Sequence, residues 1–232
     1  MTDFHTHLLP QLDDGSKSPE ISLEMLNELK KQGVKRVVAT PHFYANNESV
    51  DSFIERRSHS FSAIEDKIQN VEIILGAEVK FYSGISRLQG MKKLCLEDSN
   101  LLLLEMPFRQ WTESDINEVI NIAGSGDFTV VLAHIERYLS FLKKGTLERL
   151  LENGVLFQCN ASFFAGYFTK RKAFKMIRNN QLHFIGSDCH NLKDRSPDIN
   201  IALSALTQKF GEDFVADFID YGNKLILQNK IN

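Results

Sequence analysis

The sequence contains little cysteine, no excess of basic residues and no long apolar run. Its three cysteines, Cys95, Cys159 and Cys189, are scattered over 232 residues, too few for a disulfide framework or a cysteine-rich zinc site. The formal net charge is −3, so the composition offers no basic footprint for nucleic acid. No stretch approaches the roughly 18 apolar residues of a membrane helix, and the N-terminus lacks a signal-peptide pattern. We therefore expect a cytoplasmic protein without membrane insertion and without a nucleic-acid partner.

Short β-prone runs recur along the chain and alternate with helical patterns. The runs cover residues 2–4, 34–39, 71–75, 101–104, 129–133, 155–159 and 183–186. The helical patterns cover residues 19–31, 51–69, 113–123, 146–152, 171–179, 198–210 and 212–219. This alternation is typical of parallel βα units. It predicts a single α/β domain over residues 1–232, a barrel of seven parallel strands, with an open doubly wound sheet as the alternative.

Nearly every β-prone run is followed by a polar side chain of a type that binds metal ions. The first run leads to His5 and His7, and the later runs lead to His42, Glu78, Glu105, His134, Asn160, Asp188 and His190. The carboxyl ends of barrel strands open at one mouth, so we expect these side chains to converge there. In the loop 12–15, either Asp13 or Asp14 could turn inward, and an Asx turn or a helix cap is the alternative.

Mixed imidazole and carboxylate sets suit zinc, manganese or iron better than magnesium or calcium. The histidines and carboxylates are too many for one ion and suit two or three ions that share carboxylates. Three divalent ions against four carboxylates would leave a positive site that attracts a phosphate dianion. Such clusters activate a bridging water and stabilise in-line displacement at phosphorus. The pattern predicts a metal-dependent phosphoric-ester hydrolase.

Two arginines follow candidate ligands closely in the sequence. Arg137 comes three residues after His134, and Arg195 comes five residues after His190. The arginine fork matches phosphate oxygens, so we expect both side chains to hold the phosphate. Surface salt bridges are the alternative interpretation.

Six segments carry a resemblance to a known family. They are Asp3-Phe4-His5-Thr6-His7, Leu12-Asp13-Asp14-Gly15, Thr40-Pro41-His42, Gly76-Ala77-Glu78, Ala133-His134-Ile135-Glu136-Arg137-Tyr138 and Ser187-Asp188-Cys189-His190-Asn191-Leu192. The chain resembles the PHP (polymerase and histidinol phosphatase) superfamily over essentially its whole length. More narrowly, it is similar to the capsule-biosynthesis branch of bacterial manganese-dependent protein-tyrosine phosphatases.

The resemblance implies a distorted seven-stranded (β/α)7 TIM-like barrel that binds three divalent metal ions, commonly manganese, with iron or zinc as alternatives. It implies that Glu78 bridges ions and that Arg137 and Arg195 contact the phosphate. The implied substrate is a phosphotyrosine protein, the tail of a bacterial tyrosine kinase that drives exopolysaccharide assembly. The implied metal ligands are His5, His7, Asp14, His42, Glu78, Glu105, His134, Asp188 and His190. Two places depart from the family pattern: the loop 43–47 is less basic than expected, and Gly222 stands where an Asn-Pro pair is expected.

Three other functions compete with this interpretation. Cys189 and Arg195 have the spacing of cysteine-dependent tyrosine phosphatases, but no glycine lies between them to let backbone amides approach a phosphate. A PHP-type phosphatase of a small ester such as histidinol phosphate would keep the metals and change the substrate. A metal-binding scaffold without catalysis is the remaining alternative.

Aromatic residues near the predicted site are harder to interpret. Phe43, Tyr44 and the aromatics of residues 163–168 could form a wall that stacks on a tyrosine ring, or could simply pack in the core. Trp111 could belong to the rim of the site. We expect His59 to be solvated and His183, at the opposite end of its strand, not to be a ligand.

Overall fold

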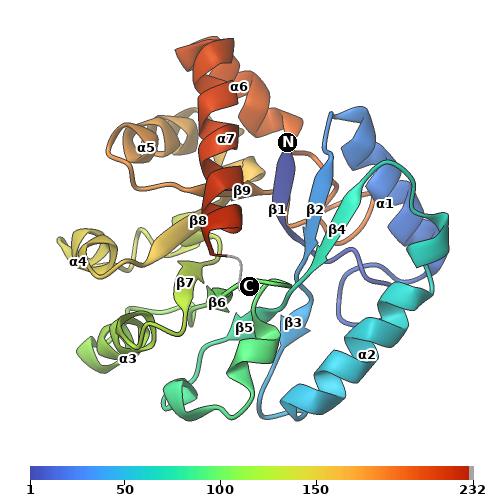
Figure 1. Cartoon of the computed structure of the whole chain (residues 1–232). Helices are drawn as coiled ribbons and strands as arrows, with labels where there is room; N and C mark the ends of the chain where they lie inside the picture. Colours follow the sequence, from blue (N-terminus) through green and yellow to red (C-terminus); the bar gives the residue numbers. More distant parts are fainter. Residues whose placement is uncertain (230–232) are drawn as a thin grey trace.

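Strands occupy the middle of the structure and helices surround them (Figure 1). This computed structural model describes residues 1–229. The strands are β1 (Thr2–Thr6), β2 (Arg36–Ala39), β3 (His42–Phe43), β4 (Glu72–Leu75), β5 (Glu78–Lys80), β6 (Leu101–Glu105), β7 (Thr129–Leu132), β8 (Leu156–Asn160) and β9 (Phe184–Gly186). The α-helices are α1 (Pro19–Lys31), α2 (Val50–Ser62), α3 (Glu113–Gly124), α4 (Thr146–Glu152), α5 (Tyr167–Arg178), α6 (Asn200–Phe210) and α7 (Glu212–Gln228). Short 3-10 helices are η1 (Glu65–Lys67), η2 (Ile85–Arg87), η3 (Met91–Leu94), η4 (Ile135–Arg137) and η5 (Ala161–Phe164).

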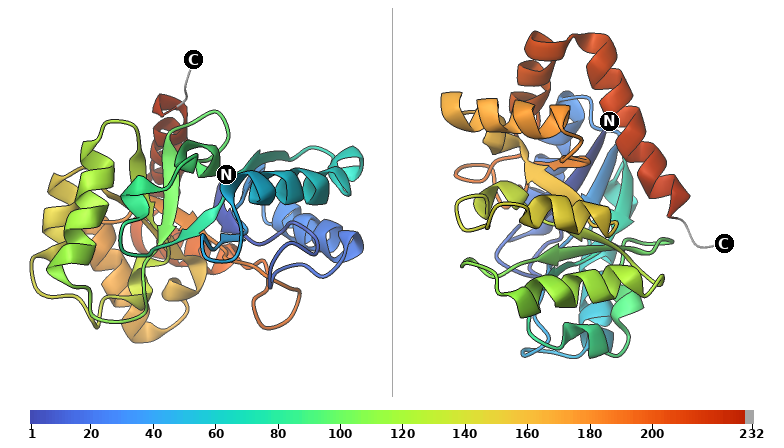
Figure 2. Two further views of the ribbon diagram at one scale, coloured as in Figure 1. Left: turned by 90° about the horizontal axis from the view of Figure 1, so that it is seen from below. Right: turned by 90° about the vertical axis from the view of Figure 1, so that its left-hand side faces the viewer.

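All strand pairs are parallel and form two sheets, β1-β2-β4 and β3-β5-β6-β7-β8-β9. The sheets curl around a common core, as the two views of Figure 2 show. This α/β architecture is consistent with a TIM-like PHP fold. It argues against the open doubly wound sheet, although the strands number nine rather than the predicted seven.

The additional strands arise where two predicted runs continue after a break. β2 and β3 are separated by Thr40 and Pro41, and β4 and β5 by Gly76 and Ala77. Proline has no amide hydrogen to donate to a strand ladder, which explains the first break. The second break lies opposite it, since the amide of Glu78 donates to the carbonyl of Pro41 at 2.9 Å. β3 and β5 are too short to give a strand pattern in the sequence.

The end of β9 lies against β1. The amide of Asp188 donates to the carbonyl of His5 at 2.8 Å, and the amide of His7 donates to the carbonyl of Cys189 at 2.9 Å. The closest approach is at Gly186, where an added Cβ would lie 2.6 Å from the Cβ of His5. The first and last strands therefore meet, and their carboxyl ends deliver side chains to the same place.

Three helices differ from their predicted ranges by four residues or more. α2 ends at Ser62, where the prediction ran to residue 69, and η1 follows it. α5 begins at Tyr167, four residues before the predicted start. α7 continues to Gln228 because Gly222 does not stop it; instead, that glycine lets the helix pack closely on the backbone carbonyl of His183.

The core follows from the strand sequences. The four leucines 101–104 of β6 are all fully buried, as expected for a parallel strand that is covered on both faces. α1 turns Met25, Leu26 and Leu29 toward this core. No helix within residues 1–229 is both long and apolar enough to cross a membrane.

Candidate metal centre

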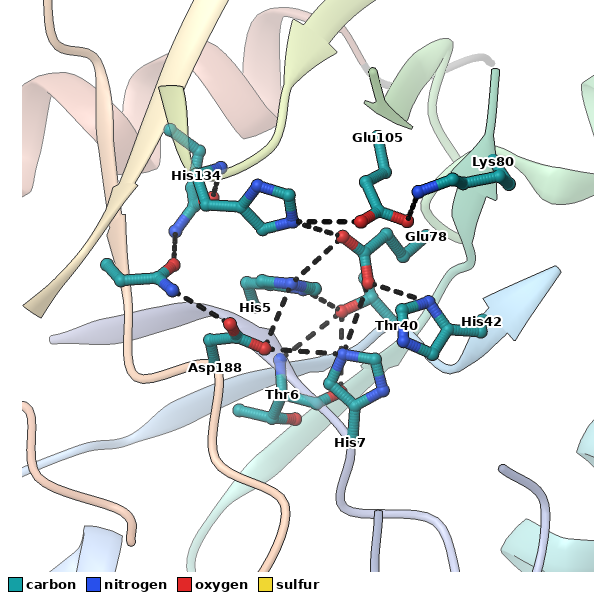
Figure 3. Close-up of polar contacts among 12 residues, drawn as sticks. His5, Thr6, His7, Thr40, His42, Glu78, Lys80, Glu105, His134 and Asp188 are labelled. Atoms are coloured by element: carbon teal, nitrogen blue, oxygen red, sulfur yellow. Dashed lines mark hydrogen bonds and ion pairs between the residues drawn. The ribbon is translucent and has the colours of Figure 1, made fainter. Parts of the chain in front are cut away.

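The structure brings all the predicted ligands together at the carboxyl ends of the strands. Figure 3 shows the cluster without Asp14 and His190. They form four overlapping groups in which the potential ligand atoms lie within 4.8 Å of one another. The groups are His7, Asp14, His42 and His190; His5, Glu78 and His134; His5, His7 and Asp188; and His42, Glu78 and Glu105. The overlap means that several ions could share ligands here.

Several spacings within the cluster fit metal ligands better than hydrogen bonds, while Nε2 of His134 and Nδ1 of His42 lie 2.7 and 3.0 Å from the oxygens of Glu78. Nε2 of His5 lies 3.4 Å from Oδ1 of Asp188 and 3.5 Å from Oε1 of Glu78. Nε2 of His7 lies 3.3 Å from Oε2 of Glu78 and 3.4 Å from Oδ1 of Asp188. These separations exceed a good hydrogen bond, but two ligands of one ion, each about 2.1 Å from it, are roughly 3–3.4 Å apart.

Several atoms of the cluster are buried without a hydrogen-bond partner among the described residues. The clearest cases are Nε2 of His5, His7 and His190. Nδ1 of His42 and Oε2 of Glu105 also make no hydrogen bond within residues 1–229, but they lie 3.0 Å from Oε2 of Glu78 and from Nζ of Lys80, respectively. Buried polar atoms without partners are costly and rare in native proteins, so a concentration of them in one place calls for a ligand. The donor set of imidazole nitrogens and carboxylate oxygens therefore fits divalent ions such as manganese, iron or zinc.

Hydrogen bonds on the outer side of the cluster turn the imidazoles inward. The Nδ1 atoms of His5 and His7 lie 2.6 Å from the Thr40 hydroxyl and 2.7 Å from Oδ2 of Asp13. Nδ1 of His190 lies 2.9 Å from the carbonyl of Asp188. With Nδ1 occupied in this way, Nε2 of each ring faces the cluster, which is the usual arrangement around metal-binding histidines.

The two aspartates of the loop after β1 have different roles. Asp13 accepts hydrogen bonds from Nδ1 of His7 and from the amide of His42, so it holds two candidate ligands from behind. Asp14 is largely exposed but points Oδ1 toward Nε2 of His42 and Nε2 of His190, at 3.5 and 3.4 Å. The sequence left either residue open as the ligand, and the geometry favours Asp14.

Gly15 is required by the same loop. A Cβ at this position would lie 2.3 Å from the carbonyl oxygen of His7 and 2.9 Å from Oδ1 of Asp13. The backbone of the loop must therefore pass directly over the first ligand segment, which only glycine permits.

The electrostatics of the cluster favour a cation at its centre. Burial alone would raise the pKa of Glu78. His5, His134 and His42 outweigh this effect and hold the pKa of Glu78 well below its usual value. Burial alone would also raise the pKa of Asp188, but His5 and His7 outweigh it, so this pKa too lies well below its usual value. Burial alone would lower the pKa of His7, but the carboxylates of Asp13, Asp188 and Glu78 raise it above its usual value. The site thus keeps its carboxylates ionised and attracts positive charge, which divalent ions supply.

Two of the candidate ligands have a left-handed backbone. His134 has φ 33° and Asp188 has φ 55°. This conformation is uncommon outside glycine and costs on the order of 1 kcal/mol or more, so it persists only where the surroundings impose it. Both residues lie two positions after the last residue of a strand, and their side chains face the cluster.

The two arginines lie at the opening of the cluster. Nη2 of Arg137 and Nη2 of Arg195 bind the two oxygens of Asp188, the second at 2.7 Å. Both side chains remain 37% exposed, so the guanidinium groups can also be reached from solvent. Their position beside the ligands argues against remote surface salt bridges.

The structure argues against a catalytic cysteine. The Cys189 side chain is fully buried, and burial raises the pKa of its thiol above the usual value. An attacking cysteine needs an accessible thiol and a lowered pKa, so Cys189 has neither property. Cys189 points away from the ligands on either side of it.

The expected aromatic wall is only partly correct. Phe43 and Phe164 are buried in the core, and Trp111 is also buried rather than part of the rim. Tyr44 is 38% exposed, and its ring centroid lies 5.4 Å from that of His42. Tyr167 and Phe168 are exposed at the start of α5, and Phe163 lines a cleft beside Arg137. A run of aromatics does not show which ring faces the core, so the sequence could not separate these roles.

The remaining histidines are where the sequence suggested. His59 is exposed on α2. His183 is buried away from the cluster, and its Nδ1 accepts a hydrogen bond from the amide of Phe157 at 3.0 Å.

Sequence reasoning missed the residues that support the ligands. Thr40 contacts His5, and the Tyr138 hydroxyl lies 3.3 Å from Nδ1 of His134. Asn160 was noted only as a polar strand end; its side-chain amide donates to Oδ2 of Asp188 at 2.8 Å. Thr40 and Tyr138 gave no signal beyond their nearness to His42 and His134 in the sequence, and Asn160 gave none beyond its place at a strand end.

Comparison with known proteins supports the resemblance in the motifs. The chain is 29% identical to tyrosine-protein phosphatase YwqE of Bacillus subtilis (strain 168), over 99% of this chain and 92% of that protein. It is 28% identical to tyrosine-protein phosphatase CpsB of Streptococcus pneumoniae over the full length of both. A solved structure from work on YwqE and CpsB, described as "unique metal-dependent tyrosine phosphatases", matches with a TM-score of 0.84 and 25% identity, and covers 100% of this chain and 96% of that chain. Residues 1–228 match the family described as "Capsular polysaccharide synthesis, CpsB/CapC", and the chain therefore belongs to the CpsB/CapC family.

Proposed function

We propose that this protein is a metal-dependent tyrosine-protein phosphatase that hydrolyses phosphotyrosine in a protein substrate. The observation that carries the proposal is the convergence of the candidate ligands, among which Nε2 of His5, His7 and His190 is buried without a hydrogen-bond partner in residues 1–229. The relatives named as tyrosine-protein phosphatases support the same reaction.

The residues that would hold the metal ions are those of the four groups. Glu78 belongs to two groups and has two carboxylate oxygens, so it could serve two ions. When bound, divalent ions supply the Lewis acid that activates water and neutralises charge on phosphoryl oxygens. The proposed content is three ions, with manganese as the first candidate and iron or zinc as alternatives. The outer hydrogen bonds from Asp13, Thr40 and Tyr138 keep the imidazoles in place before any ion arrives.

Arg137 and Arg195 are proposed to hold the phosphate. Each now binds one oxygen of Asp188, and each could turn its exposed fork to phosphate oxygens at the opening of the cluster. The amide of Asn160 holds Asp188 independently, so that the carboxylate stays in position when the arginines move to the substrate. Tyr44 beside His42 is suitably placed to contact the tyrosine ring.

The leaving group does not require a dedicated acid from the protein. A phenol has a pKa of about 10, so its anion is a far better leaving group than an alkoxide. An aryl phosphate therefore suits a site that contains metal ions and arginines but no dedicated general acid.

Several finer features belong to the same proposal. We propose that residues 1–232 form one domain and that the two sheets together make a distorted PHP barrel closed between β9 and β1. We also propose a cytoplasmic location. The phosphotyrosine substrate is proposed to be the tail of a bacterial tyrosine kinase that controls exopolysaccharide synthesis, as the family description "Capsular polysaccharide synthesis" suggests.

The test is a joint measurement of metal content and substrate preference. Protein reconstituted with manganese, iron or zinc is assayed on a phosphotyrosine peptide, histidinol phosphate and a generic aryl phosphate. We expect rapid hydrolysis of both aryl esters, bound metal in elemental analysis, and loss of metal and activity in His42→Ala with unchanged circular dichroism. A clear preference for histidinol phosphate would favour a small-ester phosphatase, and bound metal without turnover of any substrate would favour the scaffold.

A further inference from the structure

Helix α5 and its surroundings concentrate positive charge on an otherwise acidic protein. The whole chain has a formal net charge of −3, yet residues 153–187 contain no aspartate or glutamate. The basic residues of this segment all lie on α5 and are Lys170, Arg171, Lys172, Lys175 and Arg178. Lys209 of α6 lines the same groove as these side chains. α5 and α6 lie side by side, as Figure 1 shows and as the contact of Phe174 with Phe210 confirms.

The cations of this groove form no ion pair with a carboxylate of residues 1–229. Ion pairs elsewhere within residues 1–229 neutralise other lysines and arginines, but none involves these six side chains. Arg171 and Arg178 instead lie over the rings of Tyr167 and Phe210, at 5.7 and 5.5 Å. A solvated helix face usually mixes charges of both signs, so an unmixed row is a feature to explain.

The groove adjoins a cleft that lies beside the candidate metal centre. Arg137 and Asn160 contact Asp188 and also line a cleft that extends away from the cluster. Lys172 lines this cleft and also the groove along α5. The other residues of the cleft include Glu136, Ser162, Phe163 and Thr169, and Oε1 of Glu136 is turned to the amide of Asn160. A chain bound with its phosphate at Arg137 therefore has a path to the basic groove.

We propose that the groove along α5 binds an acidic segment next to the phosphotyrosine of the substrate, an inference that rests on the proposed function. The distance along the helix from Lys172 to Arg178 is about 9 Å, at about 1.5 Å per residue. Three residues of an extended peptide, at about 3.3 Å each, have the same length. Acidic side chains of the substrate can thus face successive cations, and exposed Tyr167 adds an apolar contact.

A membrane surface is the competing partner for a basic helix with exposed aromatic residues. The structure favours the peptide because the cations do not form an isolated patch: Lys172 joins them to the cleft that leads to Arg137.

The experiment uses two triple variants of the full chain with the same change in charge. Lys172→Gln/Lys175→Gln/Lys209→Gln removes three lysines of the groove. Lys35→Gln/Lys67→Gln/Lys92→Gln removes three exposed lysines on other elements, and none of them takes part in an ion pair among residues 1–229. Each metal-loaded protein is assayed on a phosphotyrosine peptide flanked by acidic residues, on the same peptide with glutamine and asparagine in their place, and on a small aryl phosphate.

The wild-type protein is expected to prefer the acidic peptide by about tenfold in kcat/KM, and the preference should shrink as salt is added. The groove variant should lose this preference relative to the aryl phosphate, and the control variant should keep it. Equal rates of the wild type on both peptides, or equal losses in both triple variants, would overturn the docking proposal alone. No turnover of any phosphotyrosine substrate by the wild type would instead overturn the proposed function. Wild-type binding to phosphatidylglycerol vesicles that the groove variant loses, with unchanged peptide kinetics, would assign the groove to membranes.

Discussion

At the scale of single residues, the candidate metal centre depends on a second layer of hydrogen bonds. Asp13 is the clearest case, because its carboxylate accepts from Nδ1 of His7, from the amide of His42 and from the amide of Gly15. These contacts lower the pKa of Asp13 in spite of burial, so the group is an anion in the folded protein. A negative charge behind His7 also makes its ring a better metal ligand.

Asp13→Asn should impair metal binding without unfolding the protein. Asparagine keeps the shape of the side chain. Its NH2 group, however, must face one of the N–H groups whose hydrogen bonds the carboxylate now accepts. We expect metal affinity and kcat/KM to fall by about 10–100-fold, the usual effect of losing such a partner. Elemental analysis and steady-state kinetics measure both quantities. Asp66→Asn, at an exposed position of η1, is the control, and unchanged metal affinity in Asp13→Asn would refute the positioning role.

Arg137→Ala should weaken phosphate binding. A charge-assisted hydrogen bond contributes about 1.5–3 kcal/mol, so kcat/KM for an aryl phosphate should fall roughly 10–100-fold. Inhibition by inorganic phosphate should weaken in parallel. Arg149→Ala removes an arginine that binds Glu113 and Asn117 and should change neither constant. If phosphate inhibits Arg137→Ala as strongly as the wild type, Arg137 does not hold the phosphate.

At the scale of secondary structure, the contact between β1 and β9 sets the position of the first ligands. Asp3, fully buried in β1, accepts hydrogen bonds from the amides of Ser187 and His5. Burial raises the pKa of Asp3 to about 6, against these hydrogen bonds. Gly186 allows the two strands to approach directly beside His5. The strands thus align His5 and Asp188 before a metal is present.

Gly186→Ala should separate these strands. The new methyl group would lie 2.6 Å from Cβ and 2.8 Å from the amide nitrogen of His5, which the backbone cannot accommodate without moving. Overpacking of this kind costs about 1–3 kcal/mol in the free energy of unfolding, which urea denaturation measures in the presence of chelator. Gly124→Ala at the end of α3 meets nothing within 4 Å and should be neutral or stabilising. Equal stability of the Gly186 variant and the wild type would contradict the close contact.

The link between β8 and β9 should make stability depend on pH. Burial lowers the pKa of His183 from 6.5 to about 4, while its Nδ1 accepts from the amide of Phe157. Between these values the unfolded chain binds a proton that the folded chain does not, so the free energy of unfolding decreases as the pH falls from 6.5 toward 4. The contribution is about 3 kcal/mol at its largest.

His183→Gln provides the comparison for this pH dependence. The glutamine oxygen can still accept from the amide of Phe157 but does not titrate. Urea denaturation across the acidic range should therefore show a shallower decline of stability than in the wild type. His59→Gln, on the exposed face of α2, should leave the slope unchanged. The same slope in wild type and His183→Gln would rule out this group as the source.

At the scale of the whole molecule, the candidate ligands connect segments from residue 5 to residue 190. Ions bound to them would stabilise only the folded chain, because the unfolded chain does not hold the ligands together. Free metal at about 100 times its dissociation constant adds about 2.7 kcal/mol to the free energy of unfolding. For a chain of this size, each kcal/mol corresponds to about 2–4 °C in Tm.

Chelation should therefore lower Tm by roughly 5–10 °C, and manganese should restore it. Differential scanning calorimetry of chelated and reloaded protein measures the shift. Asp188→Ala, which removes a candidate ligand, should melt at nearly the same temperature with and without manganese. A wild-type Tm that does not respond to chelator or metal would contradict a metal centre built into the fold.

Much of the fold could be predicted because the signals are local. Each predicted β-prone run contains a strand, and α1 and α4 have the predicted bounds, since periodicity and caps are properties of neighbouring residues. β3 and β5 were missed because strands of two or three residues leave no periodic pattern. The end of α7 was missed because glycine usually weakens a helix, whereas Gly222 is required by a contact with another strand.

The sequence by itself determined which kinds of side chain follow each strand and hence the type of metal centre to expect. Parallel strands place their carboxyl ends together, so strand order and residue type were sufficient to predict convergence. Only the tertiary structure decided that Asp13 supports His7 while Asp14 faces the cluster, and that Phe43 is in the core while Tyr44 is exposed. Two adjacent residues of similar type have the same sequence neighbourhood, and only contacts with distant segments decide which of them faces the site.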